Sequence, residues 1–155
     1  MVQKVAYLQA AQQIASQCTC ARIRRVTRTV TRIYDDALKE TGIHSSQLTL
    51  LTVAALYGDE GTGLGDLANA LGVDRTTLSR SLRPLEKEGY LRVARSPLDQ
   101  RRWLVILTRA GERAIENAFP SWERAQRSVK AKVGSRELET LHSAFGQLDS
   151  VLREP

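Results

Sequence analysis

The feature that most constrains the fold is a pair of short predicted helices separated by a tight turn. LGDLANALG (64–72) predicts a short helix that ends at its last glycine. Asp74 is a good N-cap for a second helix, RTTLSRSLRPLEKEG (75–89), which stops at Gly89. Two helices joined by a short turn that contains glycine are typical of a helix-turn-helix, and this leaves few architectures for the rest of the chain.

A predicted β-hairpin follows the second helix. Its strands are the apolar segments Val93-Ala94 and Trp103 to Leu107, and its tip is polar. The order of short helix, turn, second helix and hairpin is that of a winged helix-turn-helix. We therefore expect a mainly α protein with a small β-hairpin wing, in the α+β class.

The second helix has two distinct faces when it is placed on a helical wheel. Leu78, Leu82 and Leu85 fall on one side and should face the core. The other sides carry hydroxyl and cationic groups: Arg75, Thr76, Thr77, Ser79, Arg80, Arg83 and Lys87. Such a face can be an ordinary solvated surface, or it can enter a DNA major groove, where Arg, Ser and Thr bond to bases and phosphates.

Positive charge is concentrated in this region. The formal net charge of the 155 residues is +6, and the segment from Arg75 to Arg109 holds nine Lys or Arg against three Asp or Glu. The remainder of the chain is therefore close to neutral. The hairpin tip adds Arg95, Arg101 and Arg102 beside Asp99. A basic helix face next to a basic tip favours binding to a polyanion such as double-stranded DNA.

Long apolar stripes flank the predicted winged segment on both sides. Ile23 to Ala37 and Leu138 to Leu152 each repeat apolar residues at spacings of 3 and 4, and Thr108 can cap a long helix that Pro120 should kink or interrupt. Ser45 or Ser46 can cap the helix before the winged segment, and 58–65 is predicted as a loop.

The apolar stripes at the two ends of the chain can be buried in two ways. They can pack against each other in an intrachain bundle, or they can form an interface with a second copy of the chain, and we prefer the dimer interface. The expected division is 1–44 and 111–155 as dimerisation helices around a DNA-binding domain, 45–110.

The motifs of this central segment resemble those of the MarR family of bacterial transcription regulators. The resemblance is specific over about 64–111, and in helix layout it covers the whole chain. The matching residues are Leu67, Ala68, Leu71, Gly72, Val73, Thr76, Thr77, Leu78, Ser79, Arg80, Leu82, Leu85, Glu86, Gly89, Asp99, Arg101, Arg102, Leu107, Thr108 and Gly111.

This resemblance implies a homodimer on a palindromic DNA site, with 75–88 in the major groove. It implies Arg101 in the adjacent minor groove, Arg95 and Arg102 on phosphates, and Asp99 holding an arginine in position. Regulators of this kind often bind small aromatic or anionic effectors. From position alone, the candidate pocket residues are Arg22, Tyr34, His44 and Leu48.

Two cysteines, Cys18 and Cys20, lie among arginines in QCTCARIRRVTR. Three interpretations remain: structural cysteines, a thiol sensor, or a metal site. Cationic neighbours raise thiol reactivity, but positions i and i+2 of one helix point about 200° apart, which disfavours a disulfide within a continuous helix. If the helix begins before Cys18, then Cys18 and Arg22 stack at i, i+4. Two thiolates without a nearby His or carboxylate are an incomplete zinc set, so we expect no metal.

Other function classes find little support. The sequence contains no HExxH, P-loop, GxSxG or Rossmann fingerprint, so we expect neither an enzyme nor a cofactor. A winged module that binds protein stays open, although such a module does not require a basic wing. No segment resembles a signal peptide or a membrane span, and we expect a cytoplasmic regulator without a membrane partner.

Overall fold

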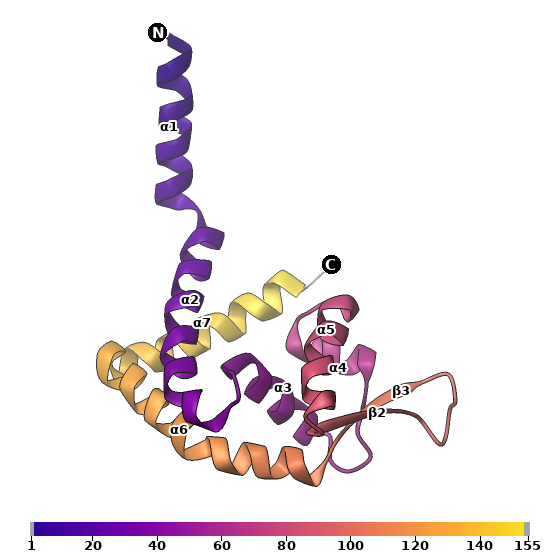
Figure 1. Cartoon of the computed structure of the whole chain (residues 1–155). Coiled ribbons are helices and arrows are strands. Elements are labelled where there is room, and N and C mark those ends of the chain that lie inside the picture. Colours follow the sequence, from indigo (N-terminus) through magenta and orange to yellow (C-terminus); the bar gives the residue numbers. More distant parts are fainter. Residues whose placement is uncertain (1, 154–155) are drawn as a thin grey trace. The chain divides into compact units, whose positions relative to one another are not determined.

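The structure is a computed structural model that describes residues 2–153, with the side chains of 6–152. The chain forms two compact units, the first ending at Ile33 and the second beginning at Tyr34. Within the described residues the protein is mostly helical, with one small antiparallel sheet (Figure 1). The predicted fold class is confirmed.

The first unit contains α1 (Val2–Gln17) and most of α2 (Thr19–Leu38), with a break at Cys18. No single helix therefore continues through Cys18. Cys18 instead precedes α2, and its Sγ accepts a hydrogen bond from the backbone N–H of Ala21 at 3.4 Å. The Arg22 guanidinium donates to the Ser16 carbonyl, a group at the end of α1 that has no partner within the helix.

The chain then turns into α3 (Ser45–Ala55) through a short 3₁₀ helix, η1 (Lys39–Thr41). Gly42 has φ +73°, a left-handed conformation that glycine adopts without strain. The prediction of Ser45 or Ser46 as the cap of α3 is wrong, because His44 is the N-cap residue. The His44 N–H donates to the Gln47 side chain at 2.9 Å, and the Ser45 N–H donates to Asp35 of α2 at 2.7 Å, so neither serine is needed as a cap.

The predicted pair of helices is α4 (Leu64–Leu71) and α5 (Arg75–Lys87). Gly72 ends α4 at φ +65°, and Asp74 caps α5 by accepting from the Thr77 N–H at 2.8 Å. Pro84 lies within α5 and does not end it. The three leucines of α5 are buried as predicted, in a core that also includes Leu38, Leu51, Leu67, Leu91 and Val105.

The wing consists of β2 (Leu91–Arg95) and β3 (Trp103–Leu107), paired with Val93 opposite Val105. Figure 1 shows this hairpin extending beyond α4 and α5. The prediction of 58–65 as loop alone is wrong in part, because β1 (Thr62–Gly63) pairs with the other edge of β3. A Cβ on Gly61, whose φ is +73°, would lie 2.6 Å from the Val105 carbonyl oxygen, so glycine permits this close approach.

Two helices complete the second unit. α6 (Arg109–Val133) begins as predicted at Thr108, whose side chain accepts from the Gly111 N–H at 3.2 Å, and α7 (Ser135–Arg153) follows Gly134. Pro120 does not interrupt α6. Ala118, Ser121 and Ala125 are buried on both sides of the proline, and this packing holds the two halves in one helix although one backbone hydrogen bond is missing.

Candidate nucleic-acid interface

The face of α5 that the sequence marks as polar is entirely exposed. It carries four cations and three hydroxyls along the helix: Arg75, Thr76, Thr77, Ser79, Arg80, Arg83 and Lys87. The buried leucines on the opposite side fix the rotation of the helix about its axis. This face is therefore presented to solvent as one continuous donor-rich surface, which suits phosphates and the acceptor edges of bases.

The hydroxyl groups of this face differ in whether their proton is already donated within the chain. Thr77 Oγ1 donates to the Asp74 carboxylate at 2.7 Å, and Ser79 Oγ donates to the Arg75 carbonyl at 2.8 Å. Thr76 makes no side-chain hydrogen bond within the part of the chain that the structure describes. Thr76 is thus the hydroxyl of α5 whose proton is available to an outside acceptor.

Asp74 fixes the start of α5 electrostatically as well as geometrically. The hydrogen bonds from the Thr77 hydroxyl and from the Thr77 N–H lower the pKa of the Asp74 carboxyl below its usual range. The charged form is favoured, and a negative charge at the first turn of a helix also interacts well with the helix dipole.

Asp99 orders the wing tip through the backbone. Its Oδ1 accepts a hydrogen bond from the Arg101 N–H at 2.9 Å, and the hydroxyl of buried Ser96 accepts from the N–H groups of Leu98 and Asp99 at 3.2 and 3.3 Å. The carboxylate therefore supports the main chain of Arg101, while the Arg101 side chain is exposed and has no hydrogen bond or ion pair with any described residue.

The other two wing arginines already have partners within the chain. The Arg95 guanidinium lies 4.1 Å from the centre of the Trp103 ring and donates to the Gln100 carbonyl at 2.8 Å. Arg102 forms an ion pair with Asp66 of α4 at 3.2 Å. Sequence reasoning missed both Asp66 and Trp103, because these contacts depend on how the hairpin folds back on itself and towards α4.

The four residues considered for an effector pocket have different surroundings. Tyr34 is half-buried, its hydroxyl donates to the Gln126 side chain of α6, and burial raises the pKa of its phenol. Leu48 is buried in the core, and His44 is exposed at the start of α3. Arg22 belongs to the first unit, where it contacts Ser16.

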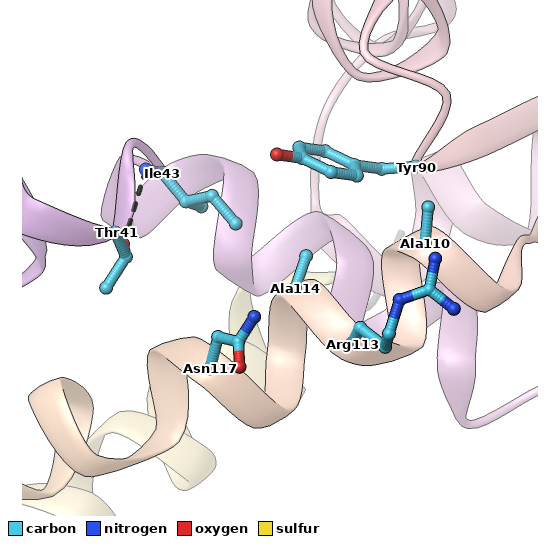
Figure 2. Close-up of a pocket in the computed structure, with 7 residues that line it drawn as sticks. All are labelled: Thr41, Ile43, Tyr90, Ala110, Arg113, Ala114 and Asn117. Atoms are coloured by element: carbon cyan, nitrogen blue, oxygen red, sulfur yellow. Dashed lines mark hydrogen bonds between the residues drawn. The ribbon is translucent and has the colours of Figure 1, made fainter.

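A cavity of about 260 Å³ lies at the start of α6 (Figure 2). Its lining is Thr41, Ile43, Tyr90, Ala110, Arg113, Ala114 and Asn117. None of these residues was singled out from the sequence, because they come from three separate segments and form no local motif.

Two further properties concern the described residues as a whole. Between residues 2 and 153, no three His, Cys, Asp or Glu side chains come together in a group that could hold a metal ion. The helices described there are too short or too polar to cross a membrane.

The helix-turn-helix of α4 and α5, the exposed basic face of α5 and the hairpin wing are the parts of a winged-helix protein. Proteins of this class contact DNA with one helix and the hairpin. A sequence model described as the MarR family matches residues 45–103. An uncharacterized HTH-type transcriptional regulator of Bacillus subtilis strain 168, YdgJ, is 35% identical over 108 residues, which are 70% of this chain and 65% of that protein. The chain thus spans slightly less than two thirds of the length of this curated relative.

Solved structures agree with this match. The M. tuberculosis transcriptional regulator MosR, solved in complex with DNA, is 32% identical with a TM-score of 0.75, covering 89% of this chain and 100% of MosR. A mutant of the E. coli regulator MarR, complexed with operator DNA, has the same fold with a TM-score of 0.78 at 20% identity, covering 88% of this chain and 96% of MarR. The chain belongs to the MarR family.

Proposed function

We propose that this protein is a homodimeric transcriptional repressor that binds a palindromic site on double-stranded DNA. The observation that carries the proposal is the exposed basic face of α5 beside a wing whose Arg101 side chain is unengaged. The complex of the related MosR with DNA supports it. In this proposal α5 enters the major groove and Arg101 the adjacent minor groove, in the cytoplasm, with no catalytic role.

The proposed contacts follow from what each side chain has free. Arg80 lies in the middle of the α5 face and reads base edges, with Thr76 as the free hydroxyl donor. Arg75, Arg83 and Lys87 contact phosphates, and Thr77 and Ser79 offer their acceptor lone pairs. Arg95 and Arg102 contact phosphates with the N–H groups that their internal partners leave over, since a guanidinium has five donors. Asp99 acts on Arg101 without touching DNA.

The homodimer is supported by apolar side chains that the single chain leaves exposed. They lie on α2, α6 and α7: Ile23, Val26, Phe119, Trp122, Leu141, Phe145, Leu148 and Leu152. Phe119 and Trp122 stack on each other with ring centroids 5.7 Å apart. Stripes of this kind are buried when helices associate, and we propose 1–44 and 111–155 as the dimerisation segments around the DNA-binding segment 45–110.

The direct test is a gel-shift titration on an operator selected from random DNA. Arg80→Ala should relax the base preference, and Arg101→Ala should weaken binding to all sites, each by about 1–3 kcal/mol. Arg127→Ala, an exposed cation of α6, is the control for lost charge. If Arg80→Ala and Arg101→Ala both bind the operator as tightly as the wild type, the proposal fails.

A second candidate is a thiol-based regulator of the same fold, and the helix break at Cys18 favours it. Because α1 ends at Gln17, Cys18 and Cys20 are not held on opposite sides of one continuous helix. A hydroperoxide can oxidise the two thiols to a disulfide, with release of an alcohol (or water) and one further water. The new bond would pull the Cys18 sulfur away from the Ala21 N–H that donates to it and would alter the α1–α2 junction.

The thiol candidate has its own test. Peroxide should release the wild type from DNA, and Cys18→Ser and Cys20→Ser should resist it. Equal release of wild type and both variants would refute this candidate and leave the DNA-binding proposal untouched. The pocket composed of Arg22, Tyr34, His44 and Leu48 stays a prediction for a small aromatic or anionic effector.

A further inference from the structure

The part of the chain outside the winged segment is close to neutral as a whole, but its charge is unevenly distributed. Residues 1–33, the first compact unit, hold six Lys or Arg and no Asp or Glu. Five of the six are arginines of α2: Arg22, Arg24, Arg25, Arg28 and Arg32. The contacts proposed for α5 and the wing do not account for this second concentration of positive charge.

Four of these arginines share one side of α2, which we call the arginine face: Arg24, Arg25, Arg28 and Arg32. At 3.6 residues per turn they fall within about 100° of each other around the helix axis. The apolar residues of the same helix lie on the opposite side, and they include Ile23 and Val26, which are proposed for the dimer interface. A dimer formed through the apolar side leaves the arginine face open to another partner.

The arginine face is exposed, and its charge is not neutralised within the chain. None of its guanidinium groups has a hydrogen bond or ion pair with any residue that the structure describes. Arg24, Arg28 and Arg32 follow each other at i, i+4, a spacing at which like charges on a helix repel. A bound polyanion would relieve this repulsion, so the face is better suited to a complex than to the free protein.

The phosphate backbone of double-stranded DNA fits this face. Arg24, Arg28 and Arg32 place three cations over about 12 Å of the helix axis. DNA carries one negative charge per roughly 1.7 Å of its own axis, so each guanidinium can find a phosphate within that length. A guanidinium also holds two phosphate oxygens by parallel hydrogen bonds. DNA is the polyanion that the rest of the chain is proposed to bind.

An anionic membrane is the other surface that a basic amphipathic helix can meet. Helices that lie in a membrane interface carry Trp, Phe or Leu on their apolar side. Between residues 19 and 33 the apolar side of α2 carries the shorter side chains of Ile and Val instead. The composition therefore favours DNA over a lipid surface.

We propose that the arginine face of α2 binds phosphates of double-stranded DNA and adds sequence-independent affinity to the contacts of α5 and the wing. The inference rests on the proposed function, since it extends the same activity to a second surface. It predicts that the first unit contributes to the salt dependence of binding and leaves the choice of base sequence to α5.

The test is a fluorescence-anisotropy titration of the full chain on the operator duplex at several salt concentrations. The triple variant Arg24→Gln/Arg28→Gln/Arg32→Gln should reduce the slope of log affinity against log salt by about 2.7, which is about 0.9 for each lost phosphate contact. The single variant Arg28→Gln should reduce it by about 0.9, so the test does not depend on how well the triple variant folds. Arg24→Lys/Arg28→Lys/Arg32→Lys keeps the charge and should keep the slope.

The matched control is Lys130→Gln/Lys132→Gln/Arg136→Gln, which removes the same charge from exposed positions of α6 and α7. This control should keep the wild-type slope. Equal slopes for the wild type and the glutamine variants of α2 would overturn the proposal. An equal loss in the control would overturn it too, because net charge alone would then set the slope.

Two further outcomes separate this inference from its alternatives. Unchanged slopes on DNA, together with binding of the wild type but not the triple variant to vesicles of phosphatidylglycerol, would assign the face to a membrane surface and overturn the DNA contact. A wild type that binds the operator no better than an unrelated duplex would refute the proposed function instead. The slope comparison on the unrelated duplex would then still test the arginine face.

Discussion

At the scale of single residues, Gly111 illustrates why a motif glycine is needed. A Cβ at this position would lie 2.2 Å from the Tyr90 carbonyl oxygen and 2.6 Å from a Leu107 methyl group. The first of these neighbours is backbone that already bonds to Thr108, so it cannot move aside cheaply. The first turn of α6 can approach the Tyr90 carbonyl, which directly precedes β2, this closely only because Gly111 has no side chain.

Gly111→Ala should destabilise the protein by about 1–3 kcal/mol or more, as overpacking generally does. Gly146→Ala is the matched control, because Gly146 lies in α7 with no atom within 4 Å of the added Cβ and should gain about 1 kcal/mol from helix propensity. Urea unfolding of both variants measures the difference. Equal stabilities would contradict the close approach at Gly111.

Asp74 makes stability depend on pH at the start of α5. Its pKa is lowered on folding, so its contribution is present above the unfolded pKa, near 3.8, and is lost as pH falls through the folded value. Asp74→Asn keeps an acceptor for the Thr77 N–H and removes the charge. The wild type should be the more stable of the two at pH 7, and the gap should close towards pH 2. Urea midpoints at both pH values check this, and a gap that persists in acid would show that the charge is not its cause.

At the scale of elements, the winged segment could be predicted because its signals are local. The leucine spacing determines which side of α5 is buried, and Gly72 and Asp74 mark the turn before it. The exposed basic face of α5 follows from these two signals. Elements that depend on distant partners could not be predicted. β1 is two residues long and exists through its pairing with β3, and α6 passes through Pro120 because packing compensates for the lost hydrogen bond.

The same distinction applies to the candidate site: features set by the local sequence could be predicted, and contacts with distant residues could not. The exposure of Arg80 and Arg101 follows from the helical wheel and the hairpin tip. The internal partners of Arg95 and Arg102 do not, since Trp103 stands across the hairpin and Asp66 lies 36 residues away along the chain. The sequence places charge in the wing but does not reveal how much of it is already engaged.

The ion pair between Arg102 and Asp66 should moderate DNA affinity more than it stabilises the fold. Both side chains are more than half exposed (59% and 58%), and exposed pairs contribute about 0–1 kcal/mol. Asp66→Asn removes the carboxylate that offsets the charge of Arg102, so the phosphate contact of Arg102 should displace about one more counterion and steepen the slope of log affinity against log salt by about 0.9. Asp59→Asn, which removes the same charge from an exposed position in the loop before β1, is the control. Identical slopes for the two variants would mean that only net charge matters.

At the scale of the whole molecule, the exposed stripe of α7 should decide the oligomeric state. Leu141→Glu combined with Leu148→Glu places two charges where a partner helix would pack, and it should shift the protein to a monomer in analytical ultracentrifugation. Gln147→Glu adds a charge to the opposite side of the same helix and should leave the dimer intact. A wild type that sediments as a monomer, or a double variant that stays dimeric, would exclude α7 as the interface.

The stacking of Arg95 on Trp103 also gives the wing a built-in optical reporter. A guanidinium 4.1 Å from an indole ring alters its emission, and the wing is the part proposed to enter a groove. The chain has one other tryptophan, Trp122 of α6, so a Trp122→Phe variant would emit from the wing alone. Movement of the hairpin on and off DNA could then be followed in real time by stopped-flow fluorescence, without any attached dye.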